Sequence, residues 1–127
     1  MTNFFAIFVI LHGLVHLWYV TLSLRLFAFK PEMGWSGKSW LLTSMIGDVG
    51  ARAAASALYS LAALGFIAAG VGLLYEQGWF RPTMLWSAIL SLTAIVIFWD
   101  GSTSQIIEKG LLGFVINVVL ILVLLVF

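Results

Sequence analysis

The sequence of 127 residues contains no cysteine. Disulfides, thiolate metal sites, iron–sulfur clusters and cysteine nucleophiles are therefore excluded, and cysteine usage does not indicate the redox compartment. A metal ion or haem iron would have to be bound by His, Asp, Glu or Met side chains. His12 is followed by Gly13 rather than Glu, so the His-Glu-x-x-His zinc motif is absent. We expect no metal site.

Charged residues are also scarce. Six Lys and Arg and five Asp and Glu make up 9% of the chain, and the net charge is +1. The basic residues are not clustered, which argues against a nucleic-acid partner because phosphate binding needs a basic patch. Hydrophobic residues make up 63% of the chain, and the mean hydropathy is +1.15. Such a chain cannot cover a water-facing surface, so we predict an integral membrane protein surrounded by membrane lipids.

Four apolar segments are long enough to cross the bilayer as helices, which requires about 20 residues each. They cover about residues 3–24, 53–75, 83–99 and 110–127. Every backbone N–H and C=O group inside the lipid must form a hydrogen bond within the protein, so helices are expected. The short second and third links favour antiparallel packing of neighbouring helices. The sequence therefore predicts an all-α domain over residues 1–127, an integral membrane bundle of four transmembrane helices.

The first link contains a second kind of pattern. Trp35, Trp40, Met45 and Val49 recur at roughly helical spacing, which predicts a short helix over about residues 35–50 lying along the membrane interface. A lid over a cavity is the alternative.

The distribution of basic residues predicts the orientation of the chain. The first link carries four of them and the third link carries Lys109, whereas the opposite side has Arg81 and the amino terminus. The positive-inside rule places the first and third links in the cytoplasm and both termini outside.

Small residues dominate the second span, with several pairs spaced four apart, such as Ala53 with Ala57 and Ala68 with Gly72. Small side chains let a neighbouring helix approach closely. We expect the second span to lie in the centre of the bundle or at the interface of a homo-oligomer.

Each expected span contains polar side chains at a similar depth. With a rise of about 1.5 Å per residue, His16, Tyr59, Ser91 and Asn117 lie about 9 to 13 Å from the cytoplasmic ends of their spans, and His12 lies one turn deeper. Polar groups inside a membrane face the bundle interior. We therefore expect His16 to meet Asn117, Tyr59 or a hydroxyl of the third span, and the five to form a ligand-binding site. The five residues are His12, His16, Tyr59, Ser91 and Asn117.

Four charged residues are expected at the mouth of the same cavity, which would open towards the cytoplasm. The rim residues are Asp48, Arg52, Asp100 and Glu108. A cavity with a polar floor between helices is typical of ligand sites in helical bundles.

Three interpretations of the two histidines remain open. They can form hydrogen bonds that hold helices together, bind a ligand or handle a proton, or ligate a metal or haem. Axial haem ligation by both is excluded because the two nitrogens would approach from the same side. A haem held by a single histidine stays possible.

The chain resembles the DoxX-like group of small four-helix membrane proteins. The resemblance rests on the four spans, on Gly13 in the stretch LHGLVH, and on the last link DGSTSQIIEKGLLG running into the fourth span. Members of that group are associated with quinone-linked thiosulfate oxidation and membrane redox complexes. The resemblance implies the fold and suggests a redox association, but it carries over no catalytic residue.

We therefore predict a membrane protein that binds a lipid-like or quinone-like molecule in an intramembrane cavity. A homo-oligomeric transporter or channel with a histidine-lined path is one alternative, and an accessory subunit of a larger membrane complex is another. No nucleophile paired with a base appears within a span, so no reaction is assigned.

Overall fold

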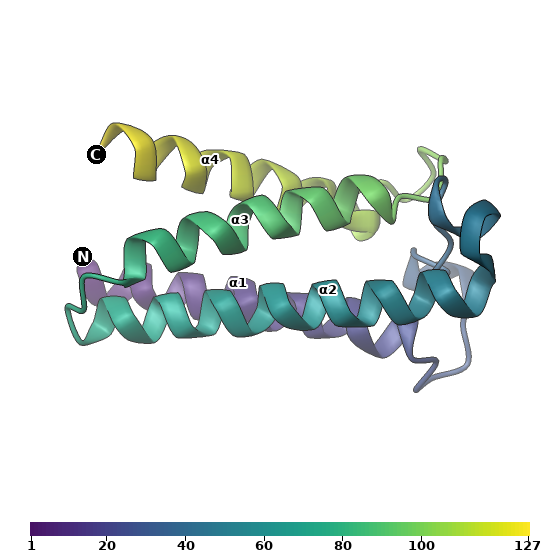
Figure 1. Cartoon of the computed structure of the whole chain (residues 1–127), viewed down its shortest axis with the longest axis horizontal. Coiled ribbons are helices and arrows are strands. Elements are labelled where there is room, and N and C mark those ends of the chain that lie inside the picture. Colours follow the sequence, from purple (N-terminus) through teal and green to yellow (C-terminus); the bar gives the residue numbers. More distant parts are fainter.

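The computed structural model describes residues 1–127 and contains helices but no strands. Successive long helices run in opposite directions, and both termini lie at the same end of the bundle (Figure 1). The prediction of an all-α four-helix architecture is confirmed. The helices are α1 (Thr2–Ser23), α2 (Leu42–Leu74), α3 (Phe80–Ile97) and α4 (Leu112–Val126), with a 3-10 turn η1 (Pro31–Met33) and a π-helical turn η2 (Ile107–Leu111) that leads into α4.

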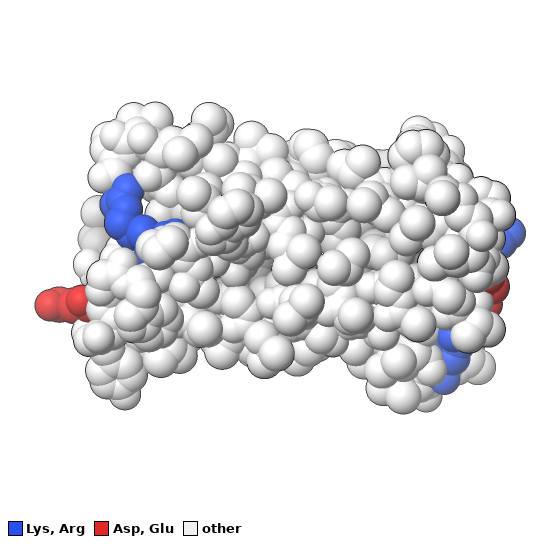
Figure 2. Space-filling view, viewed as in Figure 1, with Lys and Arg blue, Asp and Glu red and all other residues white.

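The bundle has the surface of a membrane protein. α1, α2, α3 and the continuous stretch of η2 with α4 are each long and apolar enough to cross a bilayer. Charged side chains gather at the two ends, and the visible face between them is uncharged (Figure 2). The chain is therefore a multi-pass integral membrane protein by the length and composition of its helices.

The second helix begins earlier than predicted, at Leu42 rather than near residue 53. Gly47 interrupts its first part with a φ of 81°, a conformation that glycine adopts without steric cost. The separate interfacial helix expected over residues 35–50 is not seen as an element of its own. Residues 42–46 are helical and continue into α2 across this kink.

The residues that precede α2 bind the end of α3. The last carbonyl groups of a helix have no partner within the helix. Here the carbonyl groups of residues 96–99, at the end of α3 and directly after it, accept hydrogen bonds from the first link. These bonds close this end of the bundle. The pairs are Trp40 Nε1 with Val96 O, Ser39 Oγ with Ile97 O, Trp35 Nε1 with Phe98 O, and Trp40 N with Trp99 O.

α2 lies in the centre of the bundle, since it packs against both α1 and α3. Small residues make this contact close: a Cβ atom at Gly13 of α1 would lie 2.8 Å from Phe66 Cβ and 3.0 Å from the Ala63 carbonyl oxygen. On the other side, Gly65 faces Ser87 of α3. The small residues of α2 thus contact helices of the same chain.

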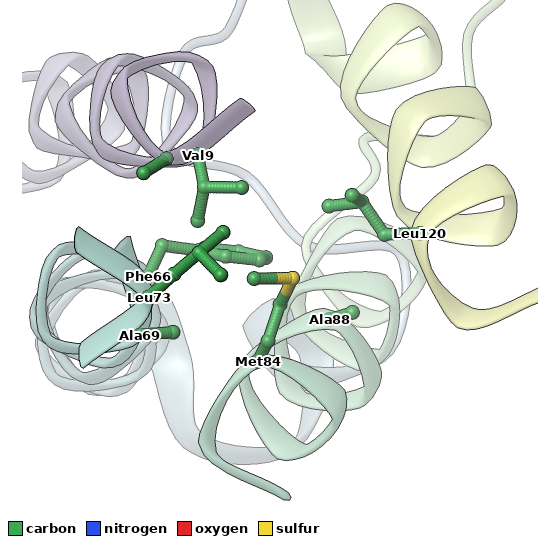
Figure 3. Close-up of a cluster of buried hydrophobic side chains, with 8 residues drawn as sticks. Val9, Phe66, Ala69, Leu73, Met84, Ala88 and Leu120 are labelled. Atoms are coloured by element: carbon green, nitrogen blue, oxygen red, sulfur yellow. The ribbon is translucent and has the colours of Figure 1, made fainter. Parts of the chain in front are cut away.

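The apolar core nearer the termini draws on all four long helices (Figure 3). Val9 of α1, Phe66 of α2, Met84 of α3 and Leu120 of α4 point towards one another there. A second buried cluster, which is rich in aromatic rings, fills the opposite end. Tyr59 belongs to the second cluster, while His12, His16, Ser91 and Asn117 belong to neither.

Candidate ligand-binding cavity

The two histidines lie on the face of α1 that is buried in the bundle. Ala6, Val9, His12, His16 and Tyr19 recur at intervals of three or four residues, and all are buried. Positions three and four apart lie on the same face of a helix. This spacing explains why both imidazoles point inward, with ring centroids 5.1 Å apart.

Four polar side chains form a closed set of hydrogen bonds, which we call the polar circuit: His12, His16, Ser91 and Asn117. His12 Nε2 lies 2.9 Å from Asn117 Oδ1, and Asn117 Nδ2 donates to Ser91 Oγ at 2.7 Å. Ser91 Oγ lies 2.6 Å from His16 Nε2, and His16 Nδ1 lies 2.9 Å from the His12 carbonyl oxygen. The circuit joins α1, α3 and α4 in the middle of the bundle.

For neutral imidazoles, the hydrogen-bond geometry fixes the direction of every proton in the polar circuit. A carbonyl oxygen only accepts, so His16 Nδ1 carries a proton, and a neutral imidazole then has a bare Nε2. Ser91 donates its single proton to that nitrogen and accepts from the amide group of Asn117. The amide oxygen of Asn117 is left to accept from His12 Nε2–H. His12 Nδ1 is consequently a bare acceptor.

This arrangement refines the expected contacts of His16. It does meet a hydroxyl of the third span, that of Ser91, but its contact with Asn117 runs through Ser91. Asn117 binds His12 directly. Tyr59 makes no hydrogen bond with either histidine, and its ring centroid lies 6.2 Å from that of His16.

A cavity of about 150 Å³ lies beside the polar circuit. All four long helices and η2 contribute to its wall. Four of its side chains are polar, and the rest of the wall is apolar or glycine. The lining residues are His12, Val15, His16, Tyr19, Tyr59, Ile95, Ile107, Gly110, Leu112, Gly113 and Ile116.

Of the five predicted ligand-binding residues, the structure places three on the wall of this cavity: His12, His16 and Tyr59. Ser91 and Asn117 are fully buried behind the wall and orient the imidazoles. Their side chains fill the space between the helices and do not reach the cavity. Tyr19 was missed as a cavity residue, although it lies three residues after His16 and seven after His12 on the same face.

Two polar atoms on the cavity residues make no hydrogen bond within the chain: Tyr59 Oη and His12 Nδ1. Tyr59 has only 2% of its surface exposed. No fully enclosed side-chain nitrogen or oxygen of the protein lacks a partner. Both atoms therefore keep contact with open space, and both residues line the cavity. The hydroxyl of Tyr19, by contrast, has a partner, because it donates to the Glu108 carbonyl oxygen at 2.8 Å.

From the exposure of its lining residues we infer that the cavity reaches the surface between α1 and α4, whereas the sequence led us to expect an opening at the cytoplasmic end. Val15 of α1 and Leu112 of α4 line it and are both exposed on the lipid-facing surface. α1 packs mainly on α2, and α4 mainly on α3, so the seam between α1 and α4 is loosely closed.

The end of the bundle is closed by Trp35, whose surface is 1% exposed. Its ring centroid lies 5.9 Å from that of Tyr19 and 5.8 Å from that of Tyr59. The indole was expected at the membrane interface. Its N–H instead donates to the carbonyl oxygens of Phe98 and Lys38, which makes deep burial of this polar ring possible.

The four residues expected at the rim lie at the same end of the bundle but do not line the cavity. Arg52 pairs with Asp48 at 2.9 Å and also donates to the Ser23 carbonyl oxygen. Asp100 pairs with Lys109 at 2.9 Å, while the exposed Glu108 contributes only its carbonyl oxygen to Tyr19. The charged side chains of Arg52, Asp48 and Asp100 are paired outside the cavity.

The chain has no group of three or more His, Asp and Glu side chains that could hold a metal ion. Of the four imidazole nitrogens, only His12 Nδ1 is free of hydrogen bonds. A haem bonded through an Nε2 atom would have to break the polar circuit.

Comparison with protein-family models, with curated proteins and with solved structures gives no match for this chain.

Proposed function

We propose that this membrane protein binds a lipid-like or quinone-like molecule in the cavity between α1 and α4. The observation that carries the proposal is the hydroxyl of Tyr59, which makes no hydrogen bond with the protein and keeps contact with open space, although the residue lines the cavity and is only 2% exposed as a whole. The DoxX-like resemblance suggests the same class of ligand.

The surroundings of that hydroxyl make an unpaired state energetically costly. A buried polar group without a partner costs about 1–3 kcal/mol, and the hydrocarbon layer offers no water to satisfy it. A bound molecule with a polar end supplies the missing partner. Its apolar remainder would leave the cavity past Val15 and Leu112, where it replaces lipid contacts at little cost.

The wall also explains why the polar end would have to be small. The volume of about 150 Å³ holds a group of roughly the size of a benzene ring, but no folded acyl chain. The ligand therefore combines a compact polar head with an apolar tail outside the cavity. Native mass spectrometry of the full-length protein released from lipid, with lipid extraction from the same sample, is the direct experiment.

Gly113 offers a way to close the cavity without a clash in the backbone. A Cβ atom there would have Ile95 Cδ1 as its nearest neighbour, at 3.5 Å, which is ordinary contact. The variant Gly113→Leu should fill the cavity and reduce the bound molecule at least tenfold. Gly78→Leu, where a Cβ meets nothing within 4 Å, is the matched control and should keep the ligand. Equal occupancy in Gly113→Leu and the unchanged protein would reject the cavity as the binding site.

A further inference from the structure

The polar circuit holds the helices together, and it also determines whether His12 Nδ1 can donate or accept a hydrogen bond with a ligand. The His12 carbonyl oxygen can only accept, and the hydrogen bonds continue from it through His16, Ser91 and Asn117 back to His12 Nε2. Each step leaves one choice for the proton. His12 Nδ1 is therefore held as a hydrogen-bond acceptor.

We propose that the cavity selects a ring-sized head that carries a hydroxyl group on an apolar tail, as in an alkylated phenol. This inference rests on the proposed function and names the class of ligand. The hydroxyl donates its proton to His12 Nδ1, and its oxygen accepts the proton of Tyr59 Oη. A hydroxyl is a suitable group because it both donates and accepts, which matches one bare nitrogen and one free O–H on two residues that line the same cavity.

The shape of the cavity supports a flat aromatic head over a flexible one. Aromatic rings of His12, His16, Tyr19 and Tyr59 form its inner wall, and the volume is about 150 Å³. An apolar cavity of about that size in a protein interior binds benzene. The apolar mouth at Val15 and Leu112 leads to lipid, so a tail opposite the hydroxyl would lie among acyl chains.

The prediction distinguishes a hydroxyl from an ether of almost the same shape. The probes are 4-dodecylphenol, its methyl ether 4-dodecylanisole, and dodecylbenzene, each titrated into the full-length protein in nanodiscs and measured by native mass spectrometry. The phenol should bind about tenfold more tightly than the ether, because the ether leaves His12 Nδ1 without a donor. The hydrocarbon should bind most weakly.

Ser91→Ala tests whether the polar circuit causes this preference. Without the serine hydroxyl, the Asn117 amide and His16 Nε2 lose their partner, so the amide can turn and His12 can carry its proton on Nδ1. The preference for phenol over ether should fall towards one. Ser87→Ala is the matched control on the same helix, since its hydroxyl donates to the Thr83 carbonyl oxygen outside the circuit, and it should keep the preference.

A spectroscopic measurement on the unchanged protein tests the same idea without a variant. The chain has two histidines, so the ¹⁵N spectrum of histidine-labelled protein contains four ring signals. His12 should show a bare Nδ1 that shifts when the phenol binds and not when the ether binds. Equal affinity of the three probes, or a protonated Nδ1 in the free protein, would overturn this inference while leaving the proposed function standing. Absence of saturable binding by all three would count against both.

Discussion

His12 Nε2 lies 2.9 Å from Asn117 Oδ1, and this hydrogen bond joins the first and last helices across 105 positions of the sequence. α1 and α4 are otherwise not a closely packed pair. The bond therefore holds together the seam through which the cavity opens. Stability and access to the cavity depend on the same two side chains.

Asn117→Leu should destabilise the protein by about 1–2 kcal/mol, because it removes both hydrogen bonds of the amide and leaves His12 Nε2–H unpaired. Unfolding in mixed detergent with increasing dodecyl sulfate measures the effect. Val115→Leu, at a lipid-facing position of the same helix, should change stability by less than 0.5 kcal/mol, which is about the usual range for surface substitutions. Equal stability of the two variants would show that the circuit contributes nothing.

Gly13→Ala should cost about 1–3 kcal/mol, because the added methyl group would meet Phe66 Cβ at 2.8 Å and the Ala63 carbonyl oxygen at 3.0 Å. α1 would have to move away from α2 to admit it. Gly113→Ala is the control, since its nearest neighbour is at 3.5 Å, and it should be neutral or slightly stabilising. The thermal midpoint of each variant in detergent measures the difference, and a stabilised Gly13→Ala would contradict the close packing of these helices.

Trp35→Ala should cost about 3–5 kcal/mol, as expected for the loss of a fully buried Trp. Trp35→Phe should cost less, about 1–2 kcal/mol, because it keeps the packing and loses the two hydrogen bonds to Phe98 and Lys38. Trp86 is exposed towards lipid, so Trp86→Phe should have little effect. The same unfolding assay applies. If Trp35→Phe and Trp86→Phe behaved alike, the first link would not close the bundle.

Lys109→Met should destabilise the protein by about 1–3 kcal/mol, because the side chain is 5% exposed and its partner Asp100 would remain as an unpaired carboxylate. Adding Asp100→Asn should recover part of the loss, since the second change removes the uncompensated charge. A double-mutant cycle measures this coupling. Lys30→Met, at an exposed position of the first link, is the control and should have little effect. Strict additivity of the two changes would show that the ion pair does not contribute.

The sequence predicted most of the fold because bilayer thickness and backbone hydrogen bonding leave few choices for a chain with so little charge. The number of spans followed from these constraints, and the small residues of the second span favoured a place in the centre of the bundle or at an oligomer interface. The second span was expected from about residue 53, whereas α2 begins at Leu42 and passes a kink at Gly47, so Asp48 and Arg52 belong to the helix. In the structure they pair one turn apart on the helix surface at 2.9 Å.

The candidate site was predictable only in part. Hydrocarbon surroundings turn polar side chains inward, so the sequence could place His12, His16, Ser91 and Asn117 between the helices. Which of them would bond to each other depends on the rotation of each helix about its axis, and no pattern in the sequence states that rotation. Tyr19 was missed although its spacing from His12 and His16 places it on the same face of α1. Trp35 was placed at the interface because a helix was expected over residues 35–50, whereas the structure buries it in the irregular segment before α2.

The sequence by itself determined that this chain is a bundle of membrane-spanning helices with polar groups in its interior, because hydrophobicity and helical periodicity are local properties. The tertiary structure alone decided the direction of the polar circuit, the unpaired state of Tyr59 Oη and the lateral position of the cavity mouth. Those features depend on ångström-scale distances between side chains from different helices, which are fixed only when the four helices pack together.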